Sequence, residues 1–273
     1  IEDQDQWWHG GISRSIKIYF TDKVFIERLH ATPTLLPGNK KGKLNVRTNI
    51  NSIDNESFVN YKLKVAITKG KKGVATKTVQ VIQKGAPKWT EKTLEEFEAG
   101  EAFFQATYWD GKMPQKERDA WQATEPIIPG PLEFDIELPV DAWSAETPNI
   151  YQVEYILSDP KGKVVQTATQ KVGFRRVEIK DHQLLVNGQP VIFYGINRHD
   201  FNKRTGRVIS KDDYRADLLA LKANNFNAIR TSHYPNDPVF MELCDELGFY
   251  VVDEANFESH AFQNQLCDDQ KYL

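Results

Sequence analysis

Apolar and polar residues alternate with a period near two between Ser15 and about Val177. Successive side chains on a strand point to opposite faces, so this alternation predicts strands with one buried face. Turn-forming stretches such as 37–39 (Pro-Gly-Asn) and 159–162 (Asp-Pro-Lys-Gly) separate the runs. The alternating apolar positions are Ile16, Ile18 and Phe20; Leu44, Val46 and Ile50; Leu63, Val65 and Ile67; Val79 and Val81; Leu132, Phe134, Ile136 and Leu138; and Val153, Tyr155 and Leu157. Strands at this spacing predict an antiparallel, immunoglobulin-like β-sandwich over residues 15–178.

Residues 84–131 interrupt this rhythm and are interpreted as an insertion, with a possible helical turn at 94–97. The stretch carries many charges together with Trp89, Trp109 and Trp121. Exposed tryptophans could stack on sugar rings, whereas buried ones would belong to a core. The sequence leaves both alternatives open.

The pattern changes after residue 183. Leu184–Val186 and Val191–Tyr194 flank Asn187-Gly188, a dipeptide that favours the type I′ turn of a hairpin. Apolar residues then recur at helical spacing, first after a capping-box pair at Ser210 and Asp213 and again between Asp237 and Gly248. Short apolar runs follow each helix, at 226–229 and 249–252. Residues 191–253 therefore predict strand, helix, strand, helix, strand, which is typical of parallel βα units.

Polar residues follow each of these three strands, at 197–200, 230–234 and 253–260, and they include His199, His233 and His260. Parallel α/β sheets build active sites at the carboxyl ends of their strands. Solvated loops are the alternative, in which Asp253 or Glu254 simply pairs with a neighbouring arginine. Glycine-rich dinucleotide and phosphate motifs are missing from the sequence, as is the G-x-S-x-G elbow. A (β/α)₈ TIM barrel is therefore the favoured architecture, of which 179–273 would form the N-terminal part.

Composition narrows the class of partners. The chain has 273 residues, about two domains, with 40% hydrophobic residues and a net charge of −3. This charge does not favour nucleic acid or an anionic membrane as a partner, and no apolar run is long enough to predict a transmembrane helix. Cys244 and Cys267 are the only cysteines, so neither a disulfide framework nor a cysteine-based zinc site is expected.

The Glu258-x-His260 spacing is compatible with a shared metal ion, or with two ordinary loop residues.

Several segments resemble family 2 glycoside hydrolases, in a form close to the large bacterial β-galactosidases. The resemblance is carried by NRHD (197–200), RTSHYPN (230–236), CDELGFYVVDEAN (244–256) and ESH (258–260) for the barrel. WSAETPNIYQVEY (143–155), VGFRRVEI (172–179) and LLVNGQPV (184–191) resemble the sandwich and its junction with the barrel. EDQDQWW-x-x-GISR (2–14) resembles the last strand of the family's jelly-roll sugar-binding domain, so residues 1–14 are predicted to be the tail of that domain.

The resemblance implies roles for particular residues. Substrate-binding positions would be Asp5, His199, Arg230, His233 and Asn256. Glu258 and His260 would bind Mg²⁺, and Asp5 would also help to bind Na⁺. Asp253 to Asn256 would shape the floor of the sugar pocket.

The resemblance also implies an activity. The family's acid/base and nucleophile glutamates lie on the fourth and seventh barrel strands, so no residue of this chain is predicted to be either. We expect the chain to be part of a longer retaining β-galactosidase that hydrolyses terminal β-D-galactosides such as lactose, and to be inactive alone. The parent is expected to be a cytoplasmic homo-oligomer, with the periplasm as an alternative location. Alternative functions are β-glucuronidase or β-mannosidase activity, or a non-catalytic carbohydrate-binding or assembly module.

Overall fold

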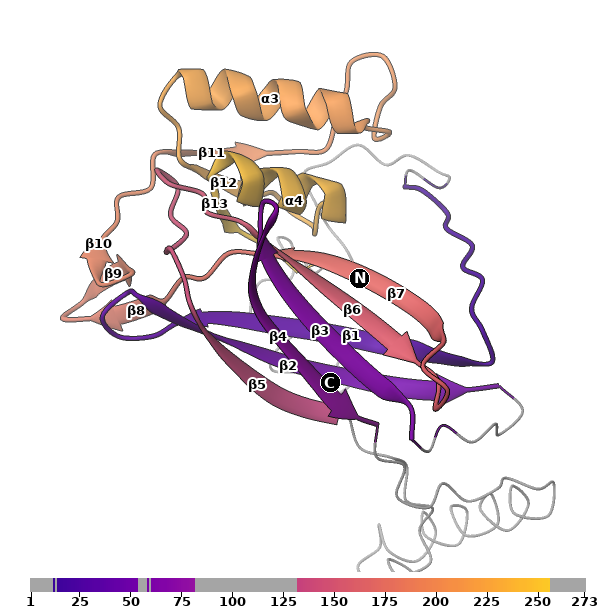
Figure 1. Cartoon of the computed structure of the whole chain (residues 1–273). Helices are drawn as coiled ribbons and strands as arrows, with labels where there is room; N and C mark the ends of the chain where they lie inside the picture. The colour runs from indigo at the N-terminus through magenta and orange to yellow at the C-terminus, as the bar shows by residue number, and fades with distance from the viewer. Residues whose placement is uncertain (1–11, 13, 54–57, 59, 82–131, 256–273) are drawn as a thin grey trace, which may run out of the picture.

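The computed structural model describes residues 12, 14–53, 58, 60–81 and 132–255. Over this part, an antiparallel β-sandwich is followed by a small three-stranded antiparallel sheet and then by parallel βα units (Figure 1). The predicted fold class, an immunoglobulin-like sandwich followed by the start of a TIM barrel, is confirmed. The 84–131 insertion lies outside the described residues, as does the predicted jelly-roll tail at 1–14 except for Ile12 and Arg14.

Two antiparallel sheets form the sandwich. One has the order β1-β2-β5, with β1 at Val24–Leu35, β2 at Lys41–Ser52 and β5 at Leu132–Pro139. The other has the order β4-β3-β6-β7, with β3 at Lys62–Lys69, β4 at Lys72–Gln80, β6 at Tyr151–Ser158 and β7 at Val164–Val172.

The sandwich core is built from alternate positions of these strands. Leu44 and Val46 on β2 are fully buried, as are Leu63, Val65 and Ile67 on β3. Their neighbours in sequence point the other way, towards solvent, as a period of two requires. Burying each such side chain stabilises the fold by about 1.5–3 kcal/mol. The inward-facing side chains therefore stabilise the packing of one sheet on the other.

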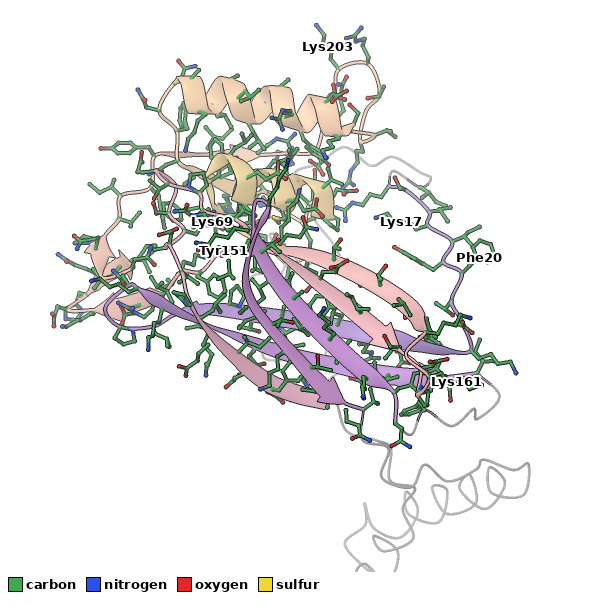
Figure 2. The ribbon with its side chains drawn as sticks, in the orientation of Figure 1. Lys17, Phe20, Lys69, Tyr151, Lys161 and Lys203 are labelled. Atoms are coloured by element: carbon green, nitrogen blue, oxygen red, sulfur yellow. The ribbon has the colours of Figure 1, made fainter. Side chains whose placement is uncertain are left out.

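The first predicted strand is wrong. Among the described residues, the stretch that carries Ile16, Ile18 and Phe20 pairs with no strand, and the first described strand is β1. All three side chains are exposed, Phe20 by 95%, and this stretch stands away from the sandwich (Figure 2). Alternation describes which way side chains point, but a strand also needs a neighbour for its backbone groups.

A three-stranded sheet follows the sandwich, with β8 at Val177–Lys180, β9 at Gln183–Val186 and β10 at Gln189–Pro190. Asn187 and Gly188 both have positive φ, 55° and 82°, as the predicted type I′ turn requires. The predicted boundary between residues 178 and 179 falls inside β8.

Val191–Tyr194 does not form the second hairpin strand, contrary to prediction. The Val191 N–H still bonds to the hairpin, donating to the Leu184 carbonyl oxygen at 3.3 Å, while the Tyr194 carbonyl oxygen accepts from the N–H groups of Asn227 and Ala228 at 2.9 and 3.2 Å. The Asn227 side chain bonds to the same segment. The Tyr194 N–H donates to Asn227 Oδ1 at 2.8 Å, and Asn227 Nδ2 donates to the Ile192 carbonyl oxygen at 3.0 Å. The strand therefore begins later, at Gly195.

Parallel βα units complete the described chain. Strands β11 (Gly195–Arg198), β12 (Ala228–Thr231) and β13 (Tyr250–Val252) alternate with helices α3 (Lys211–Ala223) and α4 (Pro238–Leu247). Both predicted helix starts are confirmed. Ser210 and Asp213 form a reciprocal capping box, and Asp237 Oδ1 accepts from the Val239 N–H at 2.9 Å. Gly248 ends α4 in the left-handed conformation.

The sandwich and the βα units are in direct contact. Trp143 Nε1 donates to the Asp245 carbonyl oxygen at 2.8 Å, and the Trp143 ring packs edge-on against Tyr250. Lys222 Nζ donates to the carbonyl oxygens of Ala145 and Gly248, at 2.9 and 2.8 Å. These bonds attach the end of α4 and the start of β13 to the sandwich. In the described part of the chain, no helix is long and apolar enough to cross a membrane.

Candidate active site

The three parallel strands end at a common edge. In their register, Asn197 on β11 pairs with Arg230 on β12, which in turn pairs with Val252 on β13. The residues that follow each strand are therefore neighbours in space although they are about 30 and 20 positions apart in sequence. The edge has the acidic, basic and imidazole groups expected of an active site.

Arg230, His233 and Glu254 form the centre of this edge. The Arg230 guanidinium forms an ion pair with Glu254 through its Nε and a Glu254 carboxylate oxygen. His233 Nδ1 lies 3.0 Å from the second oxygen of the same carboxylate. The side chains are 40%, 18% and 23% exposed respectively, so the group is open to solvent on one side.

The carboxylate determines the orientation of the histidine ring. A carboxylate only accepts hydrogen bonds, so Nδ1 of His233 must carry the proton that is donated to Glu254. Arg230 Nη2 lies 3.3 Å from the same Nδ1, but two donors cannot bond to each other. Glu254 therefore holds both the arginine and the imidazole, one with each oxygen.

Thr231 attaches the end of β13 to β12. This fully buried side chain accepts from the Glu254 N–H at 3.0 Å and donates to Asp253 Oδ1 at 3.0 Å. Glu254 is thereby fixed through its backbone as well as through its carboxylate. The edge is preorganised because its acidic group has little freedom to move.

His199 completes the described edge from β11. Its ring meets the His233 ring edge-on, with centroids 5.4 Å apart and planes at 78°. His199 is exposed, whereas Arg198 and Asp200 on either side of it are buried. The two imidazoles therefore lie side by side at the carboxyl ends of adjacent strands.

The structure places three of the predicted site residues together: His199, Arg230 and His233. The other predicted residues, which are Asp5, Asn256, Glu258 and His260, lie outside the described part of the chain. Their Mg²⁺ and Na⁺ roles stay predictions, and among the described residues no group of three or more potential metal ligands occurs.

Two polar residues of the edge were not predicted as binding residues. Glu254 had been assigned only to the pocket floor or to a simple pair with an arginine, and the arginine pair is what the structure shows. Asn197 Oδ1 lies 3.4 Å from Arg230 Nη1. The sequence offers a signal for both residues, because Asn197 and Glu254 belong to the polar clusters that follow the first and third predicted strands.

The described chain is thus a β-sandwich followed by parallel βα units whose strand ends carry the candidate site. The family model described as glycosyl hydrolases family 2 matches residues 24–175. The model of that family's TIM barrel domain matches residues 177–272. The chain belongs to glycosyl hydrolase family 2.

Curated relatives agree with this assignment. A β-galactosidase of Lactobacillus delbrueckii subsp. bulgaricus is 36% identical over 262 residues, covering 95% of this chain and 21% of the relative. A β-galactosidase of Photobacterium profundum is 32% identical over 274 residues, covering 100% of this chain and 23% of the relative. The chain thus spans about a fifth of the length of the curated relatives it matches.

Solved structures show the same fold. A β-glucuronidase of Parabacteroides merdae superposes with a TM-score of 0.63 at 21% identity, covering 86% of this chain and 24% of that one. A β-glycosidase from Bacteroides vulgatus gives 0.62 at 20% identity, covering 86% and 24%. At these identities the likeness concerns the fold alone.

Proposed function

We propose that this chain contributes part of the sugar pocket of a β-galactosidase that hydrolyses terminal, non-reducing β-D-galactosides such as lactose with retention of configuration. The observation that carries the proposal is the convergence of His199, Arg230, His233 and Glu254 on one strand edge. The substrate class is supported by relatives described as β-galactosidases at 31–36% identity.

In this proposal the described residues bind and orient the sugar. His199 and His233 offer imidazole nitrogens to sugar hydroxyls, and Arg230 keeps the Glu254 carboxylate and the His233 ring in place. Hydrogen bonds of this kind accelerate hydrolysis when they strengthen as the oxocarbenium-like transition state forms. In this proposal Arg230 binds the sugar directly and also orients it indirectly, through Glu254 and His233.

Glu254 is not proposed as an acid/base or nucleophile. Retaining glycosidases need two carboxyl groups about 5 Å apart on either side of the scissile bond. Both oxygens of Glu254 already have partners, Arg230 and His233. The resemblance assigns the catalytic glutamates to the fourth and seventh barrel strands, so we expect no turnover from this chain alone.

The ion-binding roles remain part of the proposal. Asp5 would contact both the sugar and Na⁺, and Glu258 and His260 would bind Mg²⁺, with Asn256 lining the pocket. Carboxylate oxygens suit both ions, and a bound Mg²⁺ would stabilise charge on a neighbouring carboxylate. Arg14 donates to the Pro235 carbonyl oxygen in the loop after β12, whereas the role of Asp5 is proposed on the resemblance alone.

The metal proposal has its own binding test. The whole protein is stripped with a chelator and titrated with Mg²⁺ by calorimetry, as wild type and as Glu258→Gln. We expect the variant to bind Mg²⁺ at least about tenfold more weakly because it loses a charged ligand. Equal binding would remove Glu258 from the site.

The homo-oligomeric state and the cytoplasmic location are proposed on the resemblance alone.

The activity test uses the whole protein that contains this chain. Nitrophenyl β-galactoside, β-glucuronide and β-mannoside are compared as substrates, and a preference for glucuronide or mannoside would overturn the galactosidase assignment. His199→Asn and His233→Asn are expected to lower kcat/KM for the galactoside at least about tenfold, the value of one hydrogen bond of about 1.4 kcal/mol.

His182→Asn is the matched control for both variants. His182 is exposed at the turn between β8 and β9 and has a φ of 60°, a conformation that asparagine tolerates well. Its activity should equal that of the wild type. If all three variants behave alike, the histidine pair has no role in binding the sugar.

A further inference from the structure

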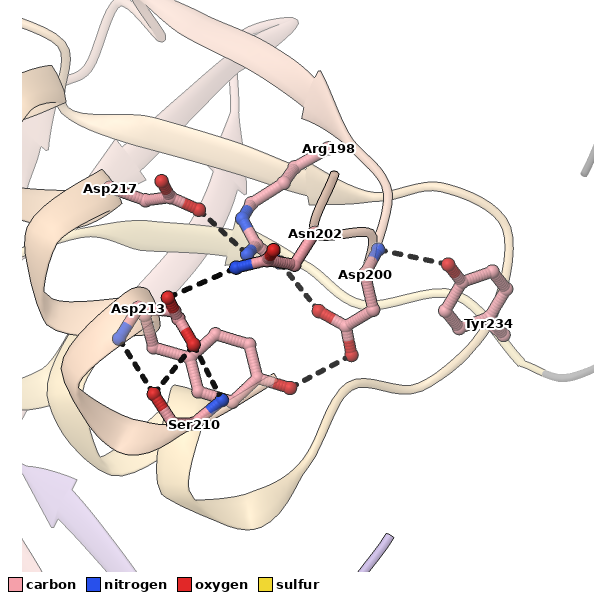
Figure 3. Close-up of polar contacts among 8 residues, drawn as sticks. Arg198, Asp200, Asn202, Ser210, Asp213, Asp217 and Tyr234 are labelled. Atoms are coloured by element: carbon pink, nitrogen blue, oxygen red, sulfur yellow. Dashed lines mark hydrogen bonds and ion pairs between the residues drawn. The ribbon is translucent and has the colours of Figure 1, made fainter. Parts of the chain in front are cut away.

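His199 and His233 are each flanked by buried polar residues that belong to one hydrogen-bond network. Arg198 and Asp200, on either side of His199, are only 6% and 5% exposed, and Tyr234, next to His233, is 4% exposed. Figure 3 shows Asp200 between Arg198 and Tyr234. The network therefore adjoins both histidines in sequence, and the Tyr234 ring lies 6.2 Å from the His199 ring between centroids.

The Asp200 carboxylate is anchored on both of its oxygens. Arg198 Nη1 donates to Oδ1 at 2.5 Å, and the Tyr214 hydroxyl on α3 donates to Oδ2 at 3.0 Å. Arg198 is itself held by Asp217, whose Oδ2 lies 2.8 Å from Nη2, and its guanidinium packs 4.9 Å from the Phe240 ring on α4. The β11 loop is thus fixed to both helices.

Tyr234 joins this anchored loop to the next one. Its hydroxyl accepts from the Asp200 backbone N–H at 2.9 Å, and the Arg207 guanidinium covers its ring at 4.4 Å. Burial raises the pKa of the Tyr234 hydroxyl, so it stays neutral. This bond joins the residue after His199 to the residue after His233.

We propose that Tyr234 is a positioning residue that sets the spacing and orientation of His199 and His233 by bonding the β11 loop to the β12 loop. The proposal rests on the proposed sugar-binding role of the two histidines. Two imidazoles on separate loops would otherwise move independently, and displacements near 1 Å can lower rates by about a hundredfold. A galactoside that bonds to both rings would then bind to a preset pair.

Tyr214→Phe is the matched control for Tyr234→Phe. Both changes remove one buried hydroxyl that bonds to Asp200, so both should lower thermal stability by a similar amount. Tyr214→Phe leaves the carboxylate anchored by Arg198 and leaves the bond between the loops intact. Tyr234→Phe removes the bond between the loops.

Both variants are made in the whole protein and measured by crystallography and by steady-state kinetics with nitrophenyl β-galactoside. We expect Tyr234→Phe to change the 5.4 Å separation of the histidine rings and to lower kcat/KM about tenfold. Tyr214→Phe should keep the separation and stay within about twofold of wild-type kcat/KM.

The two measurements separate this inference from the proposed function. If the ring separation is the same in wild type and Tyr234→Phe, or if both variants lose activity equally at equal loss of melting temperature, Tyr234 is only structural. If the wild type does not hydrolyse the galactoside, the proposed function fails, while the ring separation still decides whether Tyr234 positions the histidines.

Discussion

Replacing Asp200 by Asn tests how much the buried ion pair between Asp200 and Arg198 contributes to the free energy of unfolding. Asp200 and Asp217 both form ion pairs with Arg198, at 2.5 and 2.8 Å, but their surroundings differ. The exposed fraction of the side chain is 6% for Asp200, 54% for Asp217 and 7% for Arg198. The two aspartates therefore offer a buried and a solvated partner for one cation.

The expected loss of stability in each variant follows from this difference in exposure. Removing one partner of a buried ion pair costs about 3–5 kcal/mol because a buried charge is left uncompensated. Asp217 stays bonded to Arg198, so we expect the lower end, about 3 kcal/mol, for Asp200→Asn. Asp217→Asn removes a solvated partner and should cost about 1 kcal/mol or less.

Native-state hydrogen exchange measures both variants in the region that contains the pair. Amides of α3 and β12 that exchange only through unfolding should exchange roughly a hundredfold faster in Asp200→Asn, since each 1.4 kcal/mol is about tenfold. In Asp217→Asn the change should be about fivefold or less. Equal effects of the two variants, or less than about 1 kcal/mol for Asp200→Asn, would refute the assignment of Asp200 as the partner of Arg198 that matters more for stability.

Two further predictions concern the α4 region. Gly248→Ala should lower the urea midpoint clearly more than Gly162→Ala. Both positions have positive φ, which costs about 1–2 kcal/mol with a Cβ, but only at Gly248 would the Cβ press on the Ala145 backbone; equal shifts would contradict this contact. Cys244 is buried, and burial raises its pKa to about 12. Iodoacetamide at pH 8 should therefore modify it only after denaturation, as peptide mass mapping would show; rapid labelling of the native protein would contradict the burial.

Local chemistry made the helices predictable from sequence. The starts of α3 and α4 were placed by side chains that bond to nearby backbone, namely Ser210 and Asp213 for one and Asp237 for the other. The end of α4 was placed by Gly248, the residue that most easily adopts a left-handed conformation. Each of these signals acts within four residues, so no tertiary information was needed.

The strands were less predictable because they depend on distant partners. Ile16, Ile18 and Phe20 alternate as well as any sandwich strand, yet no strand of the described part of the chain pairs with them. At Val191–Tyr194 the main partner is Asn227, more than 30 positions away, which bonds to Ile192 and Tyr194 through its side chain and to Tyr194 through its backbone N–H. Neither fact can be derived from the local pattern.

The residue types of the candidate site were predictable, but the direction in which each one points was not. The predicted strand ended at Tyr194, so Arg198 and His199 appeared as loop residues without a defined orientation. In the structure β11 extends to Arg198, which is the last residue of the strand and turns its side chain inwards beneath α3 and α4. His199 follows with the opposite direction, as successive residues on a strand do, and therefore reaches the exposed edge beside His233.

The same alternation separates Arg230 from Thr231 on β12. Arg230 is partly exposed and bonds to Glu254, whereas Thr231 is fully buried and fixes the backbone of Glu254. A shift of one residue in this strand would exchange their positions, placing the arginine in the interior and the threonine at the edge. The register of β12 between β11 and β13 therefore determines which residue can contact a sugar, and that register is a property of the sheet rather than of the RTSHYPN segment alone.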